Sequence, residues 1–347
     1  MCEKLLVSLL QCLPPSLAHE ITCIALRCFP GISRNSFEDP VLENEVCGLS
    51  FKNPVGIAAG FDKNAECVNP LSRTGFGFLE LGTVTLKPQK GNPKPRLFRL
   101  PEDRAVINRL GFNNKGVEYF LKRLVKAKYN RSLPPIGVNI GKNATSLDAI
   151  SDYARLAKRV SKVADYVTLN ISSPNTAKLR DMQKIEILQQ LLVSVKAAVV
   201  EGMPIFIKVA PDLTDEAKVD IMQLAVKQKV TGIIVANTTI GCREKLKSKC
   251  KVEYGGLSGA PLFELSTTLL REMYKYAGGR LVFIGCGGVS DVETAYIKIR
   301  NGATLIQVYT AFTYQGFGLL NEIKKGLAQR IKSDGFRSIN EAIGLDV

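Results

Sequence analysis

The chain has 347 residues, 46% of them hydrophobic and 23% charged, a composition that predicts a folded protein of either two ordinary domains or one large barrel with an appendage. Its single histidine, His19, argues against Ser-His-Asp, Cys-His and histidine-ligated metal chemistry, and its nine cysteines include no C-x-x-C pair, which favours a reducing compartment and no structural zinc. The net charge of +15 is compatible with anionic ligands or membranes, but the basic residues are interspersed with acidic ones and no nucleic-acid motif accompanies them, so we expect no nucleic-acid partner.

Residues 1–30 are predicted to form two amphipathic helices. Leucines stand at positions 6, 9, 10 and 13, the spacing of one helical face, and the Pro14-Pro15 pair then breaks the helix. Ser16 is a candidate N-cap for a second helix, whose apolar face carries Leu17, Ile21, Ile24 and Cys28. No run reaches the roughly 18 apolar residues of a membrane span, and no cleavable signal or Arg-rich transit peptide is recognised. We expect these helices to lie on a membrane surface, followed by a linker over residues 31–44.

Residues 45–347 are predicted to form one α/β domain. A short hairpin around Gly48 comes first, and from residue 53 apolar strands alternate with helical patterns such as 185–200 and 215–227. The predicted strands are 54–59, 76–83, 136–140, 166–171, 205–209, 232–237, 281–284 and 304–309. Eight strands that alternate with helices are typical of a (β/α)8 TIM barrel, and an open doubly wound sheet is the alternative. Cys23 and Cys286 stand in apolar runs and are expected to be packed thiols.

Small or polar residues stand at the C-terminal end of every predicted strand. They are Ala58-Ala59-Gly60, Gly82-Thr83, Asn139, Asn170, Lys208, Asn237-Thr238-Thr239, Gly287-Gly288 and Tyr309-Thr310. In a barrel these positions converge on the mouth, where the active sites of this fold lie. A strand can end in a polar residue simply because it leaves the core. Eight such ends without a carboxylate nevertheless favour a large, planar, partly anionic ligand over a divalent metal.

Three segments together predict a phosphate site. Gly255-Gly-Leu-Ser-Gly259 precedes a helix, Gly285-Cys-Gly-Gly288 follows the seventh strand, and Thr310 follows the eighth. Backbone N–H groups at helix N-termini bind phosphate, and glycine allows a ligand to approach closely. Each segment alone is more often a turn, but barrels commonly bind phosphate at this position. Neither glycine cluster has the full G-x-G-x-x-G spacing, so a Rossmann dinucleotide site is not supported.

The stretch from Tyr166 to Thr176 is the strongest candidate for chemistry. Asn170 interrupts an apolar run, although asparagine disfavours strand interiors, and Pro174 fixes the backbone just after Ser173. A capped strand followed by a turn would also explain this pattern. Because other strands end in the same manner, we interpret these side chains as directed at a ligand.

Two lysines add positive charge to the predicted mouth. Lys208 lies inside an apolar run at a strand end, where a lysine can form a Schiff base or supply fixed charge to an anionic cofactor. Lys63 is the second cation. A Schiff-base lyase that uses Lys208 is therefore one alternative function, and a non-enzymatic membrane-surface module built on the N-terminal helices is another.

Several motifs resemble those of the class 2, quinone-dependent dihydroorotate dehydrogenases, of the animal mitochondrial type. In family order they are Ala58-Ala-Gly-Phe-Asp-Lys63, residues 87–96, Asn108-Arg-Leu-Gly-Phe-Asn113, Asn170-Ile-Ser-Ser-Pro-Asn175, Lys208-Val-Ala-Pro-Asp212, Gly255-Gly-Leu-Ser-Gly259 and Val308-Tyr-Thr310. The resemblance extends from about residue 15 to residue 330. It implies an FMN-containing barrel that oxidises dihydroorotate to orotate in pyrimidine biosynthesis and is reoxidised by ubiquinone.

The resemblance also implies individual roles. Ser173 is expected to be the catalytic base, where class 1 relatives have cysteine, and Lys208 is expected to stabilise the reduced flavin. The expected substrate contacts are Lys63, Asn108, Arg109, Leu110, Gly111, Phe112, Asn170, Asn175, Asn237 and Thr238. The expected FMN contacts are Ala58, Ala59, Gly60, Gly82, Thr83, Asn139, Asn170, Lys208, Ala236, Gly259, Gly288, Tyr309 and Thr310. His19, Arg99 and Tyr309 are expected at the quinone.

Two residues depart from the pattern of the animal relatives, and neither is an expected catalytic residue. Leu110 stands where those relatives typically have an aromatic residue, and Ala236 stands where threonine is usual. These two departures do not change the expected reaction, but they leave undecided which residues contact the flavin and which inhibitors the protein prefers. Animal relatives also have a targeting segment and a membrane span before the helical hairpin, so the resemblance implies a trimmed chain that belongs at the mitochondrial inner membrane.

Overall fold

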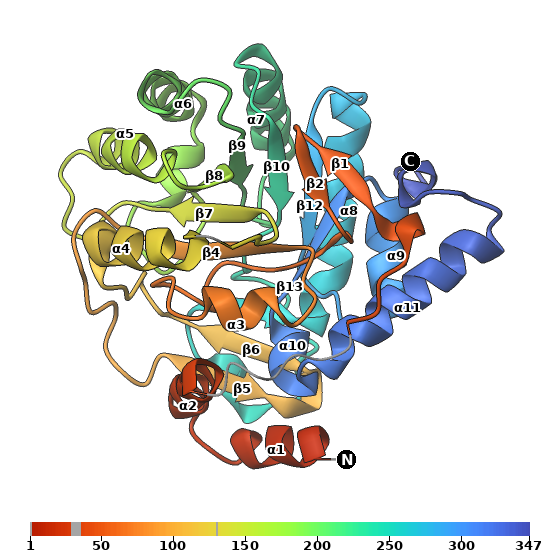
Figure 1. Ribbon diagram of the computed structural model, residues 1–347. Helices are drawn as coiled ribbons and strands as arrows, with labels where there is room; N and C mark the ends of the chain where they lie inside the picture. The colour runs from red at the N-terminus through yellow and green to blue at the C-terminus, as the bar shows by residue number, and fades with distance from the viewer. Residues whose placement is uncertain (1, 29–35, 130) are drawn as a thin grey trace.

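The computed structural model describes residues 2–28, 36–129 and 131–347, and its strands close into a barrel (Figure 1). The eight parallel strands, in barrel order, are β3 (Val55–Ile57), β4 (Phe78–Val84), β7 (Ile136–Ile140), β8 (Tyr166–Asn170), β9 (Ile205–Lys208), β10 (Gly232–Val235), β12 (Val282–Cys286) and β13 (Leu305–Val308). The last strand pairs with the first, with Ile306 opposite Val55 and Val308 opposite Ile57. This pairing confirms the predicted (β/α)8 barrel, because an open doubly wound sheet leaves its edge strands unpaired.

Helices surround the barrel, as the alternating pattern predicted (Figure 1). They are α3 (Val68–Ser72), α4 (Gly116–Lys128), α5 (Ala149–Val160), α6 (Ile185–Ala198), α7 (Asp215–Lys227), α8 (Phe263–Ala277), α9 (Val292–Arg300), α10 (Thr310–Gln315) and α11 (Gly318–Ser333). Short 3-10 segments are η1 (Pro40–Leu42), η2 (Pro101–Asp103), η3 (Arg180–Gln183), η4 (Lys249–Val252), η5 (Ala260–Leu262) and η6 (Ile339–Ala342). Side-chain capping fixes where some of these helices begin. At the start of α7, the Thr214 hydroxyl accepts a hydrogen bond from the Ala217 N–H.

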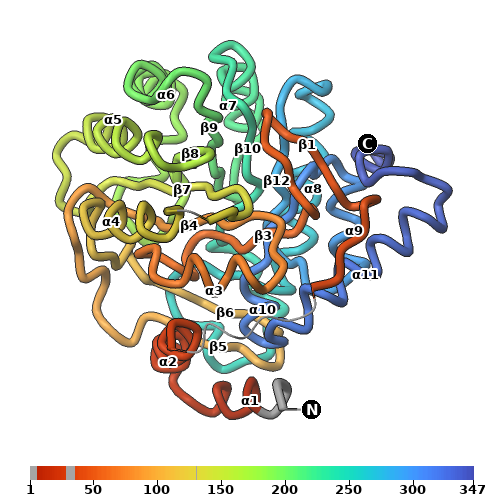
Figure 2. The backbone as a smooth tube through the Cα atoms, in the orientation of Figure 1, coloured from red at the N-terminus to blue at the C-terminus, as the bar shows by residue number. Residues whose placement is uncertain are grey.

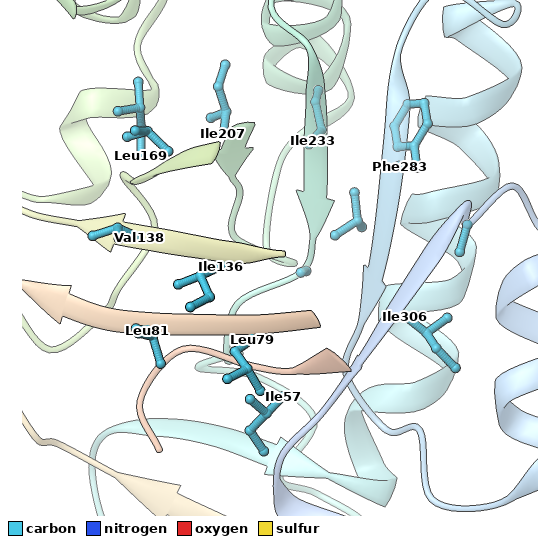
Figure 3. Packing of buried hydrophobic residues seen from close by; sticks show 14 of the residues in the cluster. Ile57, Leu79, Leu81, Ile136, Val138, Leu169, Ile207, Ile233, Phe283 and Ile306 are labelled. Atoms are coloured by element: carbon cyan, nitrogen blue, oxygen red, sulfur yellow. The ribbon is translucent and has the colours of Figure 1, made fainter. Parts of the chain in front are cut away.

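Alternate residues of the barrel strands pack on opposite faces. Leu79, Ile207 and Phe283 belong to the main core, which includes residues of the surrounding helices (Figure 3). Their sequence neighbours pack in a second cluster inside the barrel, made up of Val46, Phe51, Phe78, Tyr166, Phe206, Ile234, Ile284 and Leu305. Val46 and Phe51 come from the predicted hairpin, which forms as β1 (Asn44–Val46) and β2 (Leu49–Phe51) and fills one end of the barrel. The two clusters fix which strand residues face the interior.

The two predicted N-terminal helices are present as α1 (Cys2–Gln11) and α2 (Pro15–Cys28). The expected N-cap at Ser16 is wrong: α2 already begins at Pro15, since proline has a fixed helical φ and no N–H to leave unbonded at a first helical position. Both helices lie along one edge of the molecule, far from the β1–β2 hairpin in the view of Figure 2. The predicted apolar positions are exposed there, with Leu6 at 57% and Leu9 at 58%.

A small antiparallel sheet, which the sequence analysis missed, lies between α2 and the barrel (Figure 1). Its strands are β5 (Leu97–Leu100), β6 (Ala105–Asn108) and β11 (Gly256–Gly259). The glycine segment at 255–259 was expected to be only a loop before a helix, whereas Gly256–Gly259 pairs with β6 before η5 and α8 begin. Arg99 of β5 holds the end of α1, because its guanidinium donates to the carbonyls of Leu10, Gln11 and Leu13.

The predicted linker over 31–44 is only partly described. Residues 31–35 lie outside the described residues, and residues 36–44 contain η1 and the first residue of β1. Among the helices that the structure describes, none has the length and apolarity to cross a membrane.

Candidate active site

A cavity of about 760 Å³ lies at the carboxyl ends of the barrel strands. Its lining combines the strand ends, the small antiparallel sheet and the two N-terminal helices. Most of the predicted site residues meet there: His19, Ala58, Ala59, Gly60, Lys63, Thr83, Arg99, Asn108, Leu110, Gly111, Phe112, Asn170, Ser173, Asn175, Lys208, Ala236, Asn237, Thr238, Gly259, Gly288, Tyr309 and Thr310. The cavity therefore brings together the residues expected at the substrate, the flavin and the quinone.

Three predicted contact residues do not line this cavity. Arg109 points away from it, because its guanidinium lies 4.4 Å from the Phe98 ring and 4.1 Å from the Tyr254 ring and forms a 2.6 Å ion pair with Glu253. A substrate contact of the Arg109 side chain does not fit this geometry. Asn139 and Gly82 lie beneath the lining residues, where their strands β7 and β4 pair.

A network of amides and hydroxyls forms the floor of the site. The Asn170 amide donates to Thr83 Oγ1 (3.0 Å) and to Asn139 Oδ1 (3.2 Å). The Asn237 amide donates to Asn170 Oδ1 (3.0 Å) and to Ser172 Oγ (3.0 Å). These bonds link four barrel strands and fix the amide groups before any ligand binds, so the ligand meets a preorganised surface.

A buried carboxylate, Glu80, continues this network into the barrel. Glu80 is fully buried, and its oxygens accept hydrogen bonds from the amides of Asn139 (2.8 Å) and Gln307 (2.7 Å). Gln307 also lines the cavity, and its own Oε1 is buried without a protein partner. The sequence analysis missed both residues. A glutamate inside the apolar run of β4 was the available signal, since a buried carboxylate needs hydrogen-bond donors.

Ser173 is held in a tight turn at the cavity wall. Its side chain is buried, and its Oγ accepts a hydrogen bond from the Asn175 N–H at 3.3 Å. The Asn175 amide in turn donates to Asn108 Oδ1 at 3.1 Å, which connects this loop to β6. The hydroxyl is therefore fixed between the barrel and the small sheet, and bulk water is largely excluded from it.

Arg180, another residue that the sequence analysis missed, holds the loop that carries Ser173. Its guanidinium donates to the carbonyls of Ser172 (3.3 Å) and Thr238 (3.1 Å) and forms a 2.9 Å ion pair with Asp212. The planar guanidinium thus joins the loops that follow β8, β9 and β10. No sequence motif pointed to this role, because the three partners are distant along the chain.

Lys63 and Lys208 both reach the cavity, as predicted. Lys208 stands at the end of β9 with only 5% of its surface exposed. The Lys63 ammonium donates to the Gly60 carbonyl at 2.7 Å, and burial lowers its pKa to about 8. Among the described residues no group of three or more His, Cys, Asp or Glu side chains is arranged for a metal ion. The charge of the lysines therefore suits an organic anion.

The opposite wall has the features of a phosphate site. Gly259 and Gly288 have positive φ angles of 102° and 77°, and a Cβ on Gly288 would lie 2.5 Å from Phe263 Cα. Thr310 Oγ1 donates to Ser258 Oγ at 2.9 Å. A side chain on either glycine would collide with the protein's own backbone, so the packing and the positive φ of this wall require glycine. A flat ligand that ends in a phosphate fits this lining, since amides and lysines line one part and glycines another.

A fully buried lysine, Lys298, lies behind this wall and was also missed. Its ammonium donates to Ser266 Oγ at 2.7 Å, and that hydroxyl lies 3.0 Å from the Gly287 carbonyl. Burial lowers the pKa of Lys298 to about 7. Its place within α9 gave no sign in the sequence that it would point inward.

Aromatic side chains connect the barrel mouth to α2. The His19 ring packs edge-on against Phe61 (5.3 Å between centroids), and Phe61 packs against Tyr309 (6.2 Å). The Tyr309 hydroxyl donates to the Gly60 carbonyl at 3.2 Å. Arg99 already binds the carbonyls at the end of α1, so its guanidinium is held at the helical end of the cavity. The site therefore has a polar half in the barrel and an apolar half under the helices.

The fold and this cavity define a barrel enzyme whose site lies at the carboxyl ends of the strands. A model of the family described as dihydroorotate dehydrogenase matches residues 41–331, and the chain belongs to that family. A protein of Parvibaculum lavamentivorans named dihydroorotate dehydrogenase (quinone) is 48% identical over 340 residues, which cover 98% of this chain and 97% of the relative. A protein of Xanthobacter autotrophicus with the same name is 46% identical over 348 residues, with 98% and 97% covered.

Solved structures show the same fold. The crystal structure of DHODH from Eimeria tenella in complex with ferulenol superposes with a TM-score of 0.91 at 39% identity and covers 96% of each chain. The ligand-free structure from the same organism gives the same TM-score and identity. The expected membership of the quinone-dependent class is thereby confirmed, and so is the assignment as an oxidoreductase. This assignment removes the Schiff-base lyase and the non-enzymatic module as alternatives.

The expected mitochondrial location is wrong, and the animal type is not supported. The similar curated proteins are bacterial, including those of Parvibaculum, Xanthobacter and Rhodopseudomonas. The motifs behind the expectation surround the active site, where the chemistry is the same in every compartment. They therefore contain information about the reaction and none about where the enzyme resides.

We expect Arg180→Lys to loosen the loop that carries Ser173. Lysine cannot reproduce the forked guanidinium, and losing hydrogen bonds from a charged group costs about 1.5–3 kcal/mol. The free energy of unfolding should fall by that amount, and amide hydrogen exchange at residues 172–176 should rise. Lys184→Ala, which removes an exposed pair with Asp181, is the control and should cost about 0.5 kcal/mol or less. Equal exchange in both variants would contradict the assigned role.

Proposed function

We propose that the chain oxidises dihydroorotate to orotate at the barrel mouth, with FMN as the bound hydride acceptor and a quinone as the final electron acceptor. The observation that supports this best is the continuity of one cavity, which runs from Ser173 and Lys208 past Tyr309 to His19 and Arg99. An enzyme with two half-reactions needs two approaches to one cofactor. Dihydroorotate would enter the polar half and the quinone the apolar half.

FMN fits the lining better than a ligand without phosphate. The proposed contacts are Ala58, Ala59, Gly60, Thr83, Asn170, Lys208, Ala236, Gly259, Gly288, Tyr309 and Thr310, with Gly82 and Asn139 supporting them from below. When bound, this group supplies the acceptor for a hydride and passes electrons on singly or in pairs. Lys208 is proposed to provide positive charge where negative charge develops, at little reorganisation cost because it is already buried and fixed.

Ser173 is proposed to take a proton from C5 of dihydroorotate as hydride leaves C6. A free hydroxyl is a poor base, so its surroundings must assist it. The Asn175 N–H already donates to Ser173 Oγ and can stabilise negative charge on that oxygen. Lys63 and the amides of Asn108, Asn175 and Asn237 would hold the carboxylate and amide edges of the substrate, with Thr238, Leu110, Gly111 and Phe112 shaping the pocket.

The N-terminal helices are proposed to bind a membrane surface and admit the quinone. Leu6, Leu9, Leu17, Ile21 and Ile24 are exposed on α1 and α2, at 38–58%. The same helices line the cavity with Val7, Ala18 and Ala25, and Leu6 and Ile21 lie at its edge, so the exposed face adjoins the cavity. A quinone tail could therefore pass from lipid to the apolar half of the cavity without crossing water. Ubiquinone would meet His19, Arg99 and Tyr309 at its head.

Ser173→Ala provides the direct test of the reaction. The variant should retain FMN and bind orotate, but dihydroorotate should reduce the flavin about 10²–10⁴-fold more slowly in single-turnover stopped flow, as expected when a general base is lost. Ser173→Cys should keep part of the rate, because a thiolate can accept the proton. Ser333→Ala, on the exposed end of α11, is the control. A wild-type rate in Ser173→Ala would show that another group is the base.

The pKa of Lys63 predicts a pH dependence for orotate binding. Burial lowers the pKa of Lys63 to about 8, so the ammonium is present below that pH and is lost as the pH rises through it. Affinity for the orotate carboxylate should therefore fall between pH 7 and pH 9. Lys63→Met should bind weakly at every pH, and Lys63→Arg should keep a flat profile because arginine stays charged. Orotate titrations followed by flavin absorbance measure this, and an unchanged slope in Lys63→Met would exclude Lys63 as the cause.

If the exposed leucines contact a membrane, replacing them should weaken membrane binding and leave the reduction of the flavin by dihydroorotate unchanged. In the double variant Leu9→Glu with Leu17→Glu, two exposed positions that do not line the cavity, co-sedimentation with anionic vesicles should fall, and turnover of a long-chain quinone should fall with it. Reduction of the flavin by dihydroorotate should stay at the wild-type rate. Val193→Glu, at a position 53% exposed on α6, is the matched control. Unchanged vesicle binding in the double variant would exclude this face as the membrane contact.

A further inference from the structure

Two cysteines meet where α2 packs against the barrel, outside the chemistry proposed above. Cys23 lies on α2, and Cys67 is the N-cap residue of α3. The Cys67 thiol donates to the Cys23 carbonyl at 3.7 Å, which places the two cysteines in direct contact. Both thiols are free. The contact joins positions 44 residues apart along the chain.

The surroundings make the two thiols chemically different. The Cys67 thiol and His19, whose Nε2 lies 3.6 Å from the Cys23 sulfur, stabilise a thiolate and lower the pKa of Cys23 to about 5 against the opposing effect of burial. The same hydrogen bond, burial and the carboxylate of Asp62 raise the pKa of Cys67. Lys63 and the Asp62 carboxylate also face Cys23.

Exposure and backbone geometry add to this difference. Cys23 is partly exposed, whereas Cys67 is fully buried. Cys23 and Cys286, the two expected packed thiols, are both only partly buried against the core. The Cys67 N–H donates to the Asp62 carboxylate at 2.7 Å, which fixes the residue against α2. A partly exposed thiolate beside a buried protonated thiol is the arrangement of a redox-sensitive cysteine with its resolving partner.

We propose that Cys23 and Cys67 form a redox-modification site, at which Cys23 reduces a hydroperoxide and Cys67 then closes a disulfide between α2 and the barrel. The Cys23 thiolate attacks the terminal oxygen of the hydroperoxide and the O–O bond breaks. Cys23 becomes a sulfenic acid, and the departing alkoxide or hydroxide takes a proton from solvent and leaves as an alcohol or water. The Cys67 sulfur attacks the Cys23 sulfur, the S–O bond breaks, and the hydroxide leaves with the Cys67 proton as water. Two thiols lose two electrons in total, and the peroxide gains them.

The disulfide would act on the quinone half of the cavity. It removes the thiolate that lies beside His19 Nε2 and fixes α2 to the start of α3. This consequence rests on the proposed function, since it places the quinone near His19. The oxidation of the two cysteines does not depend on that assignment.

The test uses the full-length protein as purified, treated with hydrogen peroxide and then alkylated, digested and analysed without reduction by mass spectrometry. A Cys23–Cys67 linked peptide pair that dithiothreitol reverses is the expected product. In Cys67→Ser, dimedone should capture Cys23 as the sulfenic acid, and in Cys23→Ser, Cys67 should remain unmodified. Cys12→Ser, at the exposed residue just after α1, is the control variant and should form the same disulfide as the wild type.

Iodoacetamide labelling of the untreated protein gives an independent measurement. Cys28 is exposed on the same helix and serves as an internal control. Between pH 8 and pH 6 labelling of an ordinary thiol slows about tenfold for each pH unit, whereas labelling of Cys23 should change less than about twofold because the thiolate persists. A Cys23 profile parallel to that of Cys28, or peroxide-induced disulfides that omit the Cys23–Cys67 pair, would overturn the proposal.

Measuring the two half-reactions separately distinguishes a failure of the redox site from a failure of the proposed function. Oxidised protein should lose quinone turnover while dihydroorotate still reduces the flavin at the initial rate. If the disulfide forms and quinone turnover is unchanged, the modification site stands and the placement of the quinone beside His19 is wrong. If no disulfide forms and both half-reactions proceed, the redox site is wrong and the proposed function stands.

Discussion

The pairing of β13 with β3 is the constraint on which the site depends. It converts a row of parallel strands into a ring, so residues that are far apart in the chain become neighbours at one end. Gly60, which follows β3, thereby accepts a hydrogen bond from Tyr309, which follows β13. The same closure directs the carboxyl ends to one end of the barrel, where all but that of β7 line the cavity, and an open sheet would leave these groups along an edge.

Within that ring, polar groups are tolerated because they bind one another. Glu80, Asn139, Asn170 and Asn237 are linked in series by side-chain hydrogen bonds, and Thr83 joins them at Asn139. A buried amide or carboxylate without partners would cost several kcal/mol, so removing one member would destabilise the others. The network thus explains how an apolar barrel can present a rigid polar floor to a ligand.

The other half of the cavity is made by segments outside the barrel. β5, β6 and β11 form its wall, and α1 and α2 complete it, with α1 held by Arg99. The helices contact the barrel at few places, one of which is the contact between Cys23 and Cys67. A chemical change at that contact therefore acts on how the helices sit over the cavity and leaves the polar floor unaffected.

Strand and helix periodicity and the residues at strand ends are local properties, so the sequence alone predicted the barrel and which side chains gather at its mouth. Ser173, Lys208, Lys63 and the asparagines are found where their strands end, as expected. Tertiary structure decided the rest, since it depends on contacts between distant positions. The sheet of β5, β6 and β11 joins strands about 150 residues apart, as at Ser258 and Val106. The same reason applies to Arg109, which stacks between Phe98 and Tyr254, and to Arg180, which binds three loops. No local sequence pattern predicts such partners, because an arginine in the sequence is equally compatible with an exposed position on the surface.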